Sequence, residues 1–155
     1  MPDPLIGLDP GRASVQPGGQ ARITVTLTNT GTLVEGYRLQ VLGPVAGWSQ
    51  VDPPEVSVYP QQKASVAVVF SPPSGTGAPA GTHRFRVVAR STLDPKVGAI
   101  TEGTVDVAKV FGLQAKIVPV TSTGRWRGRH TIDVTNWGNA PAQLRMTASD
   151  PDDVL

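Results

Sequence analysis

The sequence repeats itself at an interval of 107 residues. The Ile-Thr-Val-Thr-Leu-Thr-Asn-Thr-Gly run ending at Gly31 returns as the Thr-Ile-Asp-Val-Thr-Asn-Trp-Gly run ending at Gly138, and Tyr37–Leu39 is echoed by Leu144–Met146. A unit of this length matches the ~100 residues of one β-sandwich domain and is far longer than a solenoid repeat. We therefore predict one complete domain at residues 1–110 and the first strands of a second at residues 111–155.

Alternation of apolar and polar residues with a period of two is the dominant local pattern. β-Branched residues fill the alternating positions, which favours half-buried antiparallel strands, and no segment has a clear helical period. Asn29-Thr30-Gly31 and the Asp-Pro pairs beginning at Asp3, Asp9, Asp52, Asp94 and Asp150 interrupt the runs, as turns do. The prediction is an all-β fold of tandem immunoglobulin-like β-sandwiches, the second of them incomplete within this chain.

The first copy contains enough alternating runs for a whole sandwich. The predicted strands are Leu5–Leu8 with Ser14–Val15, Ala21–Asn29, Tyr37–Leu42, Ser49–Asp52, Val56–Val58, Lys63–Ser71, His83–Ser91 and Ile100–Val110. The alternate residues that should face inward are Ile23, Val25, Leu27, Tyr37, Leu39, Val41, Trp48, Val56, Val58, Ala64, Val66, Val68, Phe70, Phe85, Val87, Ala89, Val105 and Val107. Among these, we expect Trp48 to fill the centre of the core.

The second copy contains only three predicted strands. They carry Leu113, Ala115 and Ile117, then Ile132 and Val134, then Leu144, Met146 and Ala148. Three short strands cannot build an independent core, because domains of this size usually need disulfides, metal or a partner. We expect the missing strands to come either from the remainder of a longer chain or from a protein partner that adds strands at the open edge.

Composition excludes several classes of function. Fourteen Lys and Arg against twelve Asp and Glu give a net charge of +2, which argues against wholesale nucleic-acid binding. The chain has no cysteine, so it has neither a disulfide framework nor a thiolate metal site. It shows no secretory signal and no apolar run of ~18 residues that would predict a membrane span. A cytoplasmic location, or carriage within a larger particle, is favoured over secretion through the general pathway.

Several motifs of the first copy resemble a known family. Pro17-Gly18-Gly19, the strand ending in Asn29-Thr30-Gly31, Gly47-Trp48, Pro60 and Ala80-Gly81-Thr82-His83-Arg84-Phe85 occur in the order found in the immunoglobulin-like module attached to alpha-galactosidases and to many bacterial surface proteins. The resemblance covers residues 13–91 and departs from the family at Gln61, where glycine commonly follows the proline. It implies a non-catalytic appendage.

A second resemblance concerns partners. The extended first strand, Ser91-Thr92-Leu93-Asp94-Pro95 and Gly138-Asn139-Ala140-Pro141 are similar to actinobacterial proteins described as hydrolytic, some of which are encoded among genes for phage-tail-like contractile injection particles. This resemblance implies an accessory or cargo component of such a particle. It brings no hydrolytic residues with it.

The residues that carry chemistry in enzymes are sparse. Only His83 and His130 are available as bases near neutral pH, and neither accompanies a nucleophile motif. Glu35, Glu55 and Glu102 fall in or beside turns or on an edge, so we interpret them as solvated surface charges rather than a glycosidase pair. No catalytic residue, metal site or cofactor is predicted.

Two loops have compositions found in ligand sites, but neither is predicted to bind a ligand. The glycine-rich segment at residues 74–81 lacks the lysine and the following helix of a phosphate-binding loop. The acidic segment Asp150-Pro151-Asp152-Asp153 offers oxygen ligands of the kind Ca²⁺ prefers, but a solvated turn is the simpler interpretation.

The most distinctive candidate surface is rich in arginine. Arg125, Trp126, Arg127 and Arg129 alternate with glycine just before a predicted strand, and arginine forks bind carboxylates or phosphates and stack on aromatic rings. This patch is the candidate contact for a protein partner or an anionic glycan, and the alternative is a hairpin loop that pairs with its own acidic tail. A second row, Arg84, Arg86 and Arg90, reads as a solvated strand face.

Three functions remain open from the sequence. The leading hypothesis is a non-catalytic structural or protein-interaction module that spaces or docks parts of a larger protein or assembly. The second is a glycan-binding accessory module, for which Trp126, Trp137 and Tyr59 are the available aromatic platforms. The third places a hydrolase or other catalytic activity outside this segment.

Overall fold

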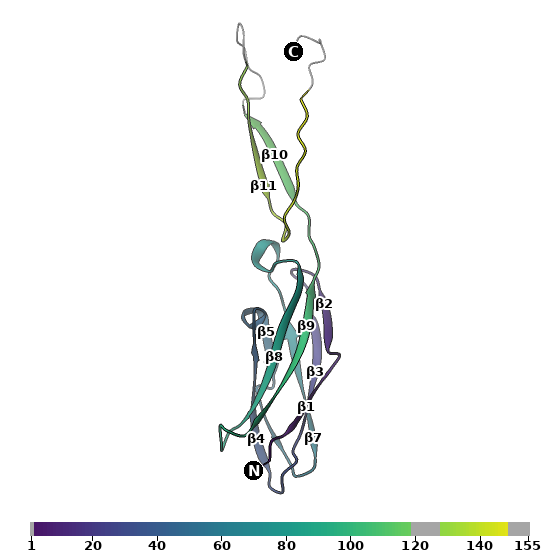
Figure 1. The fold of residues 1–155 in the computed structure, drawn as a ribbon, viewed down its shortest axis with the longest axis vertical. Coiled ribbons are helices and arrows are strands. Elements are labelled where there is room, and N and C mark those ends of the chain that lie inside the picture. The colour runs from purple at the N-terminus through teal and green to yellow at the C-terminus, as the bar shows by residue number, and fades with distance from the viewer. Residues whose placement is uncertain (1, 119–127, 149–155) are drawn as a thin grey trace.

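The computed structural model describes residues 2–118 and 128–148 (Figure 1). Within these ranges the regular structure consists of β-strands and two short 3₁₀ helices. Nine strands form a sandwich, and two more form a hairpin that extends from one end of it (Figure 1). The elements of the sandwich are β1 (Leu5–Asp9), β2 (Arg12–Val15), β3 (Ala21–Thr28), β4 (Glu35–Leu42), η1 (Ala46–Trp48), β5 (Ser49–Asp52), β6 (Glu55–Val58), β7 (Lys63–Phe70), η2 (Gly75–Gly77), β8 (Gly81–Ser91) and β9 (Gly98–Val107).

Two sheets make up the sandwich. One has the strand order β1-β3-β7-β5 and the other β2-β9-β8-β4-β6. Neighbouring strands are antiparallel, except that β2 runs parallel to β9. The first order corresponds to strands A, B, E and D of an immunoglobulin domain, and β9-β8-β4 corresponds to G, F and C. The fold is therefore an all-β, immunoglobulin-like sandwich.

Two Asp-Pro pairs mark two of the places where the chain crosses from one sheet to the other. The Asp9-Pro10 peptide lies between β1, in the first sheet, and β2, in the second. The Asp52-Pro53 peptide separates β5 and β6 in the same way, and both peptides are cis. Because proline has no amide hydrogen to donate to a ladder, it ends pairing in one sheet where the chain leaves it.

Alternate residues of the strands fill the space between the sheets. Strand β3 shows the pattern clearly, since Ile23, Val25 and Leu27 are buried while Arg22 and Thr24 are exposed. Of the inward set expected from the sequence, the residues that are buried are Ile23, Val25, Leu27, Tyr37, Leu39, Val41, Val58, Val66, Val68, Phe70, Phe85, Val87, Ala89, Val105 and Val107. Val56, Ala64 and Trp48 are partly buried against this core.

Trp48 lies at the margin of the core rather than at its centre. Its indole meets the ring of Phe70 edge-on at a centroid distance of 6.1 Å, and the imidazole of His83 at 6.2 Å. The centre is occupied by Phe70 and Phe85, whose centroids lie 5.0 Å apart and whose side chains are almost fully buried. Trp48 is the last residue of the one-turn helix η1, so its backbone is held next to the start of β5 and its ring covers the core from there.

Glu35 is buried, and the prediction of a solvated turn residue is wrong. Strand β4 begins at Glu35, two residues earlier than the alternation of apolar residues indicated. Only 4% of Glu35 is exposed, and its carboxylate accepts a hydrogen bond from the hydroxyl of Ser91. Burial, together with the negative charges of Glu35 and Asp3, raises the pKa of the neighbouring Tyr37.

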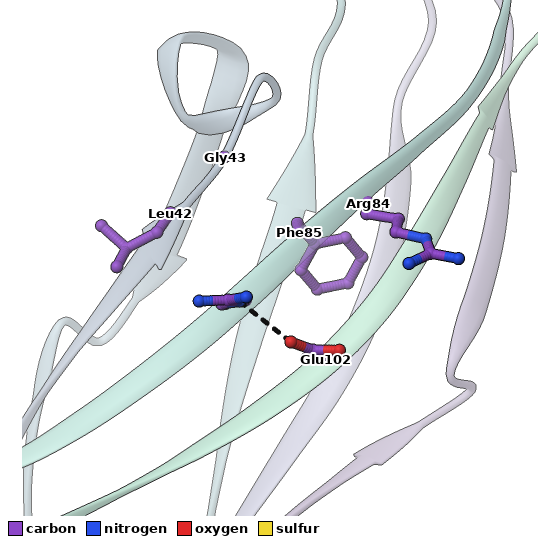
Figure 2. Close-up of a pocket in the computed structure, with 6 residues that line it drawn as sticks. Leu42, Gly43, Arg84, Phe85 and Glu102 are labelled. Carbon is purple, nitrogen blue, oxygen red and sulfur yellow. Dashed lines mark hydrogen bonds and ion pairs between the residues drawn. The ribbon is translucent and has the colours of Figure 1, made fainter.

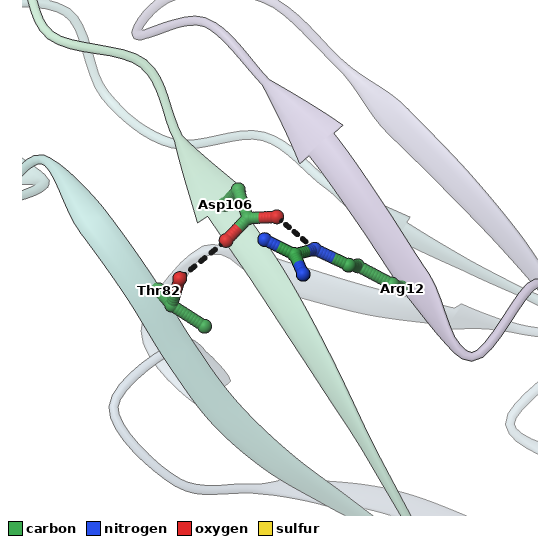
Figure 3. Close-up of polar contacts among 3 residues, drawn as sticks. All are labelled: Arg12, Thr82 and Asp106. Atoms are coloured by element: carbon green, nitrogen blue, oxygen red, sulfur yellow. Dashed lines mark hydrogen bonds and ion pairs between the residues drawn. The ribbon is translucent and has the colours of Figure 1, made fainter.

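A polar contact fastens β2 to the second sheet (Figure 3). Asp106 of β9 pairs with the guanidinium of Arg12 on β2 and accepts a hydrogen bond from the hydroxyl of Thr82 on β8. These bonds hold the pKa of Asp106 below its usual value, with the bond to Arg12 contributing most. Since β2 is only four residues long, this side-chain contact supplements a short ladder.

The Asp106 contact predicts a pH-dependent contribution to stability. A carboxylate whose pKa is lowered on folding stabilises the folded state above its unfolded pKa and loses that contribution as the pH falls towards the folded pKa. We therefore expect Asp106→Asn to lower the free energy of unfolding at pH 7, and the difference from the unmodified protein to shrink between pH 4 and pH 2. Urea unfolding at each pH measures it. Arg12→Gln should show a similar pH dependence, and a difference that is constant with pH would contradict the assignment.

The aromatic packing predicts an order of sensitivity to truncation. Phe70→Ala removes a fully buried ring and should cost about 3–5 kcal/mol of unfolding free energy. Trp48→Ala should cost less, about 1–3 kcal/mol, because the indole is already partly solvated. Tyr59→Ala, at a side chain that is 67% exposed, is the matched control and should stay within about 0.5 kcal/mol. Urea denaturation measures all three, and a larger loss for Trp48 than for Phe70 would contradict the packing.

Candidate protein-interaction site

The hairpin beyond the sandwich is a two-stranded antiparallel ribbon. Strand β10 (Leu113–Val118) pairs with β11 (Thr131–Asn136) over its whole length. Directly opposed residues of an antiparallel pair lie on the same face. The register sets Ile117 opposite Ile132 and Ala115 opposite Val134, so these four side chains share one face.

That face is apolar, and the described residues leave it partly exposed to solvent. Ile117, Ile132 and Val134 are 49%, 43% and 38% exposed, and Leu113 at the end of the same row is 47% exposed. The opposite face carries Gln114, Lys116, Asp133, Thr131 and Thr135, with Val118 at its end. Apolar side chains at alternate positions are typical of a sheet that has a second layer on that side. We call the row formed by Leu113, Ala115, Ile117, Ile132 and Val134 the apolar hairpin face.

The turn after β11 has the same hydrogen bonds as the turn after β3. The amide of Asn29 donates to the carbonyl of Leu33 at 2.8 Å, and its oxygen accepts from the backbone of Gly31 at 2.8 Å. At the 107-residue offset, Asn136 donates to Ala140 at 2.9 Å and accepts from Gly138 at 2.9 Å. Strand β11 therefore has the sequence pattern of β3 and also its terminal turn.

The surroundings of the two strands differ. Strand β3 lies between β1 and β7 in its sheet, and the other sheet covers its inward side chains. Strand β11 pairs with β10, and the described residues place no strand at its other edge and no sheet over the apolar hairpin face. The two strands thus have equivalent side chains in opposite environments.

The third strand expected in the second copy does not form. Residues 141–148 have no strand pairing, and Leu144 and Met146 are 53% and 69% exposed. The corresponding strand of the first copy, β4, pairs with β8 and β6 on its two sides. Without such neighbours among the described residues, the segment has no ladder to join.

Asn139 joins the hairpin to the sandwich. Its amide oxygen accepts from the backbone of Val110 at 2.8 Å and its amide nitrogen donates to the carbonyl of Ala108 at 2.8 Å. Its own carbonyl accepts from the backbone of Ala80, in the loop after η2, at 2.9 Å. Gly138 beside it is also buried, and a Cβ there would collide with the carbonyl oxygen of Val110. The hydrogen bonds of Asn139 therefore join the hairpin both to the linker at Ala108 and Val110 and to the loop at Ala80.

The predicted arginine surface is described only in part. Arg125, Trp126 and Arg127 lie outside the described residues. Arg129 is exposed and stands two residues before β11.

Sequence reasoning did not single out Asn139 as a structural residue, because an isolated asparagine after a strand looks like any other turn residue. The shortness of the connection at residues 108–112 was the feature of the sequence that pointed to a residue such as Asn139.

The described residues offer no arrangement of catalytic groups. The imidazole of His83 is 2.7 Å from the carbonyl oxygen of Pro79, and Glu55 pairs with Arg38 at 3.1 Å. A shallow pocket of about 260 Å³ on the second sheet is lined by Leu42, Gly43, Arg84, Phe85, Arg86 and Glu102 (Figure 2). Its polar groups are the ion pair of Arg86 with Glu102, at 2.9 Å, and the guanidinium of Arg84. Described side chains include no cluster of three metal-ligating groups.

Comparisons with known proteins assign no family to this chain. No family model matches this sequence, and a search of curated proteins finds no match. Among solved structures, the PapD-like domain 7 of human CEP192 is 14% identical, with a TM-score of 0.45 over 66% of this chain and 82% of that one. The E. coli chaperone DraB is 16% identical, with a TM-score of 0.46 over 66% of this chain and 54% of that one. E. coli alpha-2-macroglobulin is 12% identical, with a TM-score of 0.48 over 75% of this chain and 19% of that one.

No helix in residues 2–118 or 128–148 is long and apolar enough to cross a bilayer.

The hydrogen bonds of Asn139 predict how firmly the hairpin is attached. Asn139→Ala leaves the amide of Val110 and the carbonyl of Ala108 without their partner, which typically costs about 1–3 kcal/mol. We expect amide hydrogen exchange at Val110 to accelerate at least about tenfold, as measured by NMR. Thr135→Ala, on the polar face of the hairpin, is the control and should leave this rate unchanged. Unaltered exchange at Val110 in Asn139→Ala would show that the linker is held by other contacts.

Proposed function

We propose that this chain is a non-catalytic protein-interaction module. The sandwich at residues 1–110 is a rigid spacer, and residues 111–155 are the first strands of a second sandwich that a protein partner, or further chain, completes. The observation that carries the proposal is the apolar hairpin face. It has the side-chain pattern of β1 and β3, but within residues 2–118 and 128–148 no second sheet covers it.

The energetics favour covering this face. Fully burying an aliphatic side chain from water is worth about 1.5–3 kcal/mol. Leu113, Ile117, Ile132 and Val134 each retain roughly half of their exposed area, so covering all four would contribute roughly 3–6 kcal/mol. A two-stranded ribbon is marginal in water without such burial. Docking therefore stabilises the hairpin as well as the complex.

The chemistry of the face favours a protein over other partners. Its side chains are aliphatic, whereas nucleic acid needs a basic surface, and the whole chain carries a net charge of only +2. Sugar rings are held by exposed aromatic platforms, and the apolar hairpin face contains no aromatic residue. An aliphatic strand face is complementary to another aliphatic β-layer.

The narrower functions considered from the sequence remain predictions. An anionic glycan or a protein would contact the arginine surface that includes Arg129, and charge reversal there should weaken its capture. A role as an accessory or cargo component of a contractile injection particle rests on sequence resemblance alone. Any hydrolase activity would lie outside this segment.

Site-specific photo-crosslinking tests the proposed function. A photoreactive amino acid placed at Ile132 or Val134 faces the predicted interface, and one placed at Asp133 faces away from it on the same strand. In the source cells, we expect a defined protein adduct from positions 132 and 134 and little from position 133. Mass spectrometry identifies the adduct. Equal adduct formation from both faces, or neither an intermolecular nor an intramolecular adduct from positions 132 and 134, would contradict the proposal.

A further inference from the structure

The two edges of β11 are not equivalent. The backbone of Trp137 donates to the carbonyl of Gly112 at 2.7 Å, so this amide points towards β10. Amides of successive strand residues point in opposite directions, so those of Asn136, Val134 and Ile132 point away from β10. In the first copy this same edge is paired, because Asn29 donates to Gln62 at 3.0 Å and accepts from Gln61 at 2.9 Å.

The terminal asparagines show the same difference. The amide nitrogen of Asn29 donates to Leu33 and also to Val58, each at 2.8 Å, and Asn29 is only 2% exposed. Asn136 makes the equivalent bond to Ala140 but is exposed, and the described residues place no counterpart of β6 or β7 beside it. The contacts that bury Asn29 thus come from β6 and from the residues just before β7, and the described residues place no such neighbours beside β11.

The geometry points to the outer edge of β11 as the acceptor for one antiparallel β-strand with the chemistry of β7. This inference rests on the proposed function and specifies the partner: an extended segment whose alternate aliphatic side chains join the apolar hairpin face. In the first copy that strand is β7, which pairs with β3 over Ala21–Thr28 and supplies Val66, Val68 and Phe70 to the core.

The register of the incoming strand follows from the first copy. There Thr28 is opposite Lys63, Thr26 is opposite Ser65 and Thr24 is opposite Ala67. At the 107-residue offset these threonines become Thr135, Asp133 and Thr131. The residue at the Ser65 position of the incoming strand therefore lies opposite Asp133.

Charge then narrows the sequence of the partner. Opposite charges directly across a strand pair stabilise it and like charges destabilise it. Asp133 already has Lys116 opposite it on β10. A basic residue opposite Asp133 on the incoming strand would complete an alternating row of charges across three strands. The preferred partner is thus a β7-like strand with Lys or Arg at the position of Ser65.

Disulfide trapping tests the edge, the direction and the register together. The chain has no cysteine, so Thr135→Cys and Thr131→Cys each introduce a single thiol into the full protein. The probes are synthetic peptides with the β7 sequence of residues 59–71, carrying either Lys63→Cys or Ala67→Cys. Opposed residues at these non-hydrogen-bonded positions have Cα atoms about 4.5 Å apart, within disulfide range, whereas a four-residue mismatch separates them by about 13 Å.

The matched pairs should react much faster than the mismatched ones. We expect Thr135→Cys with Lys63→Cys, and Thr131→Cys with Ala67→Cys, to form disulfides at least about tenfold faster than the two crossed combinations. Changing Ser65 of the peptide to Lys should tighten its binding about two- to fivefold, and changing it to Glu should weaken it. Equal trapping in all four combinations would overturn the inference.

A proline variant separates edge pairing from docking on the face. Val134→Ala shortens the apolar side chain and keeps the backbone amide. Val134→Pro keeps three apolar side-chain carbons but removes the amide that points to the outer edge, a position where an edge strand tolerates proline. We expect fluorescence anisotropy to show at least about fivefold weaker binding of the labelled β7 peptide to Val134→Pro than to Val134→Ala. Equal binding to the two variants would overturn edge pairing. Sedimentation that shows the protein self-associated and unable to bind the peptide would overturn it as well.

Failure of this inference is distinguishable from failure of the proposed function. If positions 132 and 134 crosslink a cellular protein while the peptides show no register preference, the module binds a partner through its face and the strand-acceptor inference is wrong. If neither experiment detects a partner, both are wrong.

Discussion

A strand in this protein is held when two conditions are met together: its edges are paired and its apolar face is covered. Strand β3 meets both, since it lies between β1 and β7 and its inward side chains are completely buried. Strand β11 has the same alternation and the same asparagine turn, but in the part of the chain that the structure describes only one of its edges is paired and no sheet covers its apolar face. Aliphatic side chains gain free energy when they leave water, and strand amides can exchange water for a neighbouring strand, so under the proposed function the difference between these two strands is where binding would gain free energy.

Position along the strand, more than residue type, decided which expectations from the sequence held. The alternating aliphatic residues of β3 and β7 predicted their own burial, because a period of two leaves each residue only one face to occupy. Trp48 and Glu35 could not be placed this way. The burial of Trp48 depends on η1, and that of Glu35 depends on Ser91, which is distant in sequence. Contacts between distant segments leave no periodic signal.

In the candidate site, too, the sequence predicted local structure but did not predict contacts between distant segments. The 107-residue offset predicted β11 and its turn, because the Asn-x-Gly pattern encodes a local hydrogen-bonded geometry. The role of Asn139 was not visible, because its partners are the backbone groups of Val110 and Ala108. Backbone groups are present at every position, so the sequence does not reveal which of them a side chain will reach.

An open strand edge is a hazard as well as a binding site, since it is a template for pairing with any extended chain. In β11 the hazard is reduced by charge: Asp133 lies in the middle of the strand and Arg129 stands just before it. Either residue disfavours a strand that places a like charge opposite that residue. An aliphatic segment without a charge gains no electrostatic stabilisation from Asp133 or Arg129. The same two side chains that limit indiscriminate pairing therefore set the sequence preference of the edge, so protection against aggregation and selection of a partner have one physical origin.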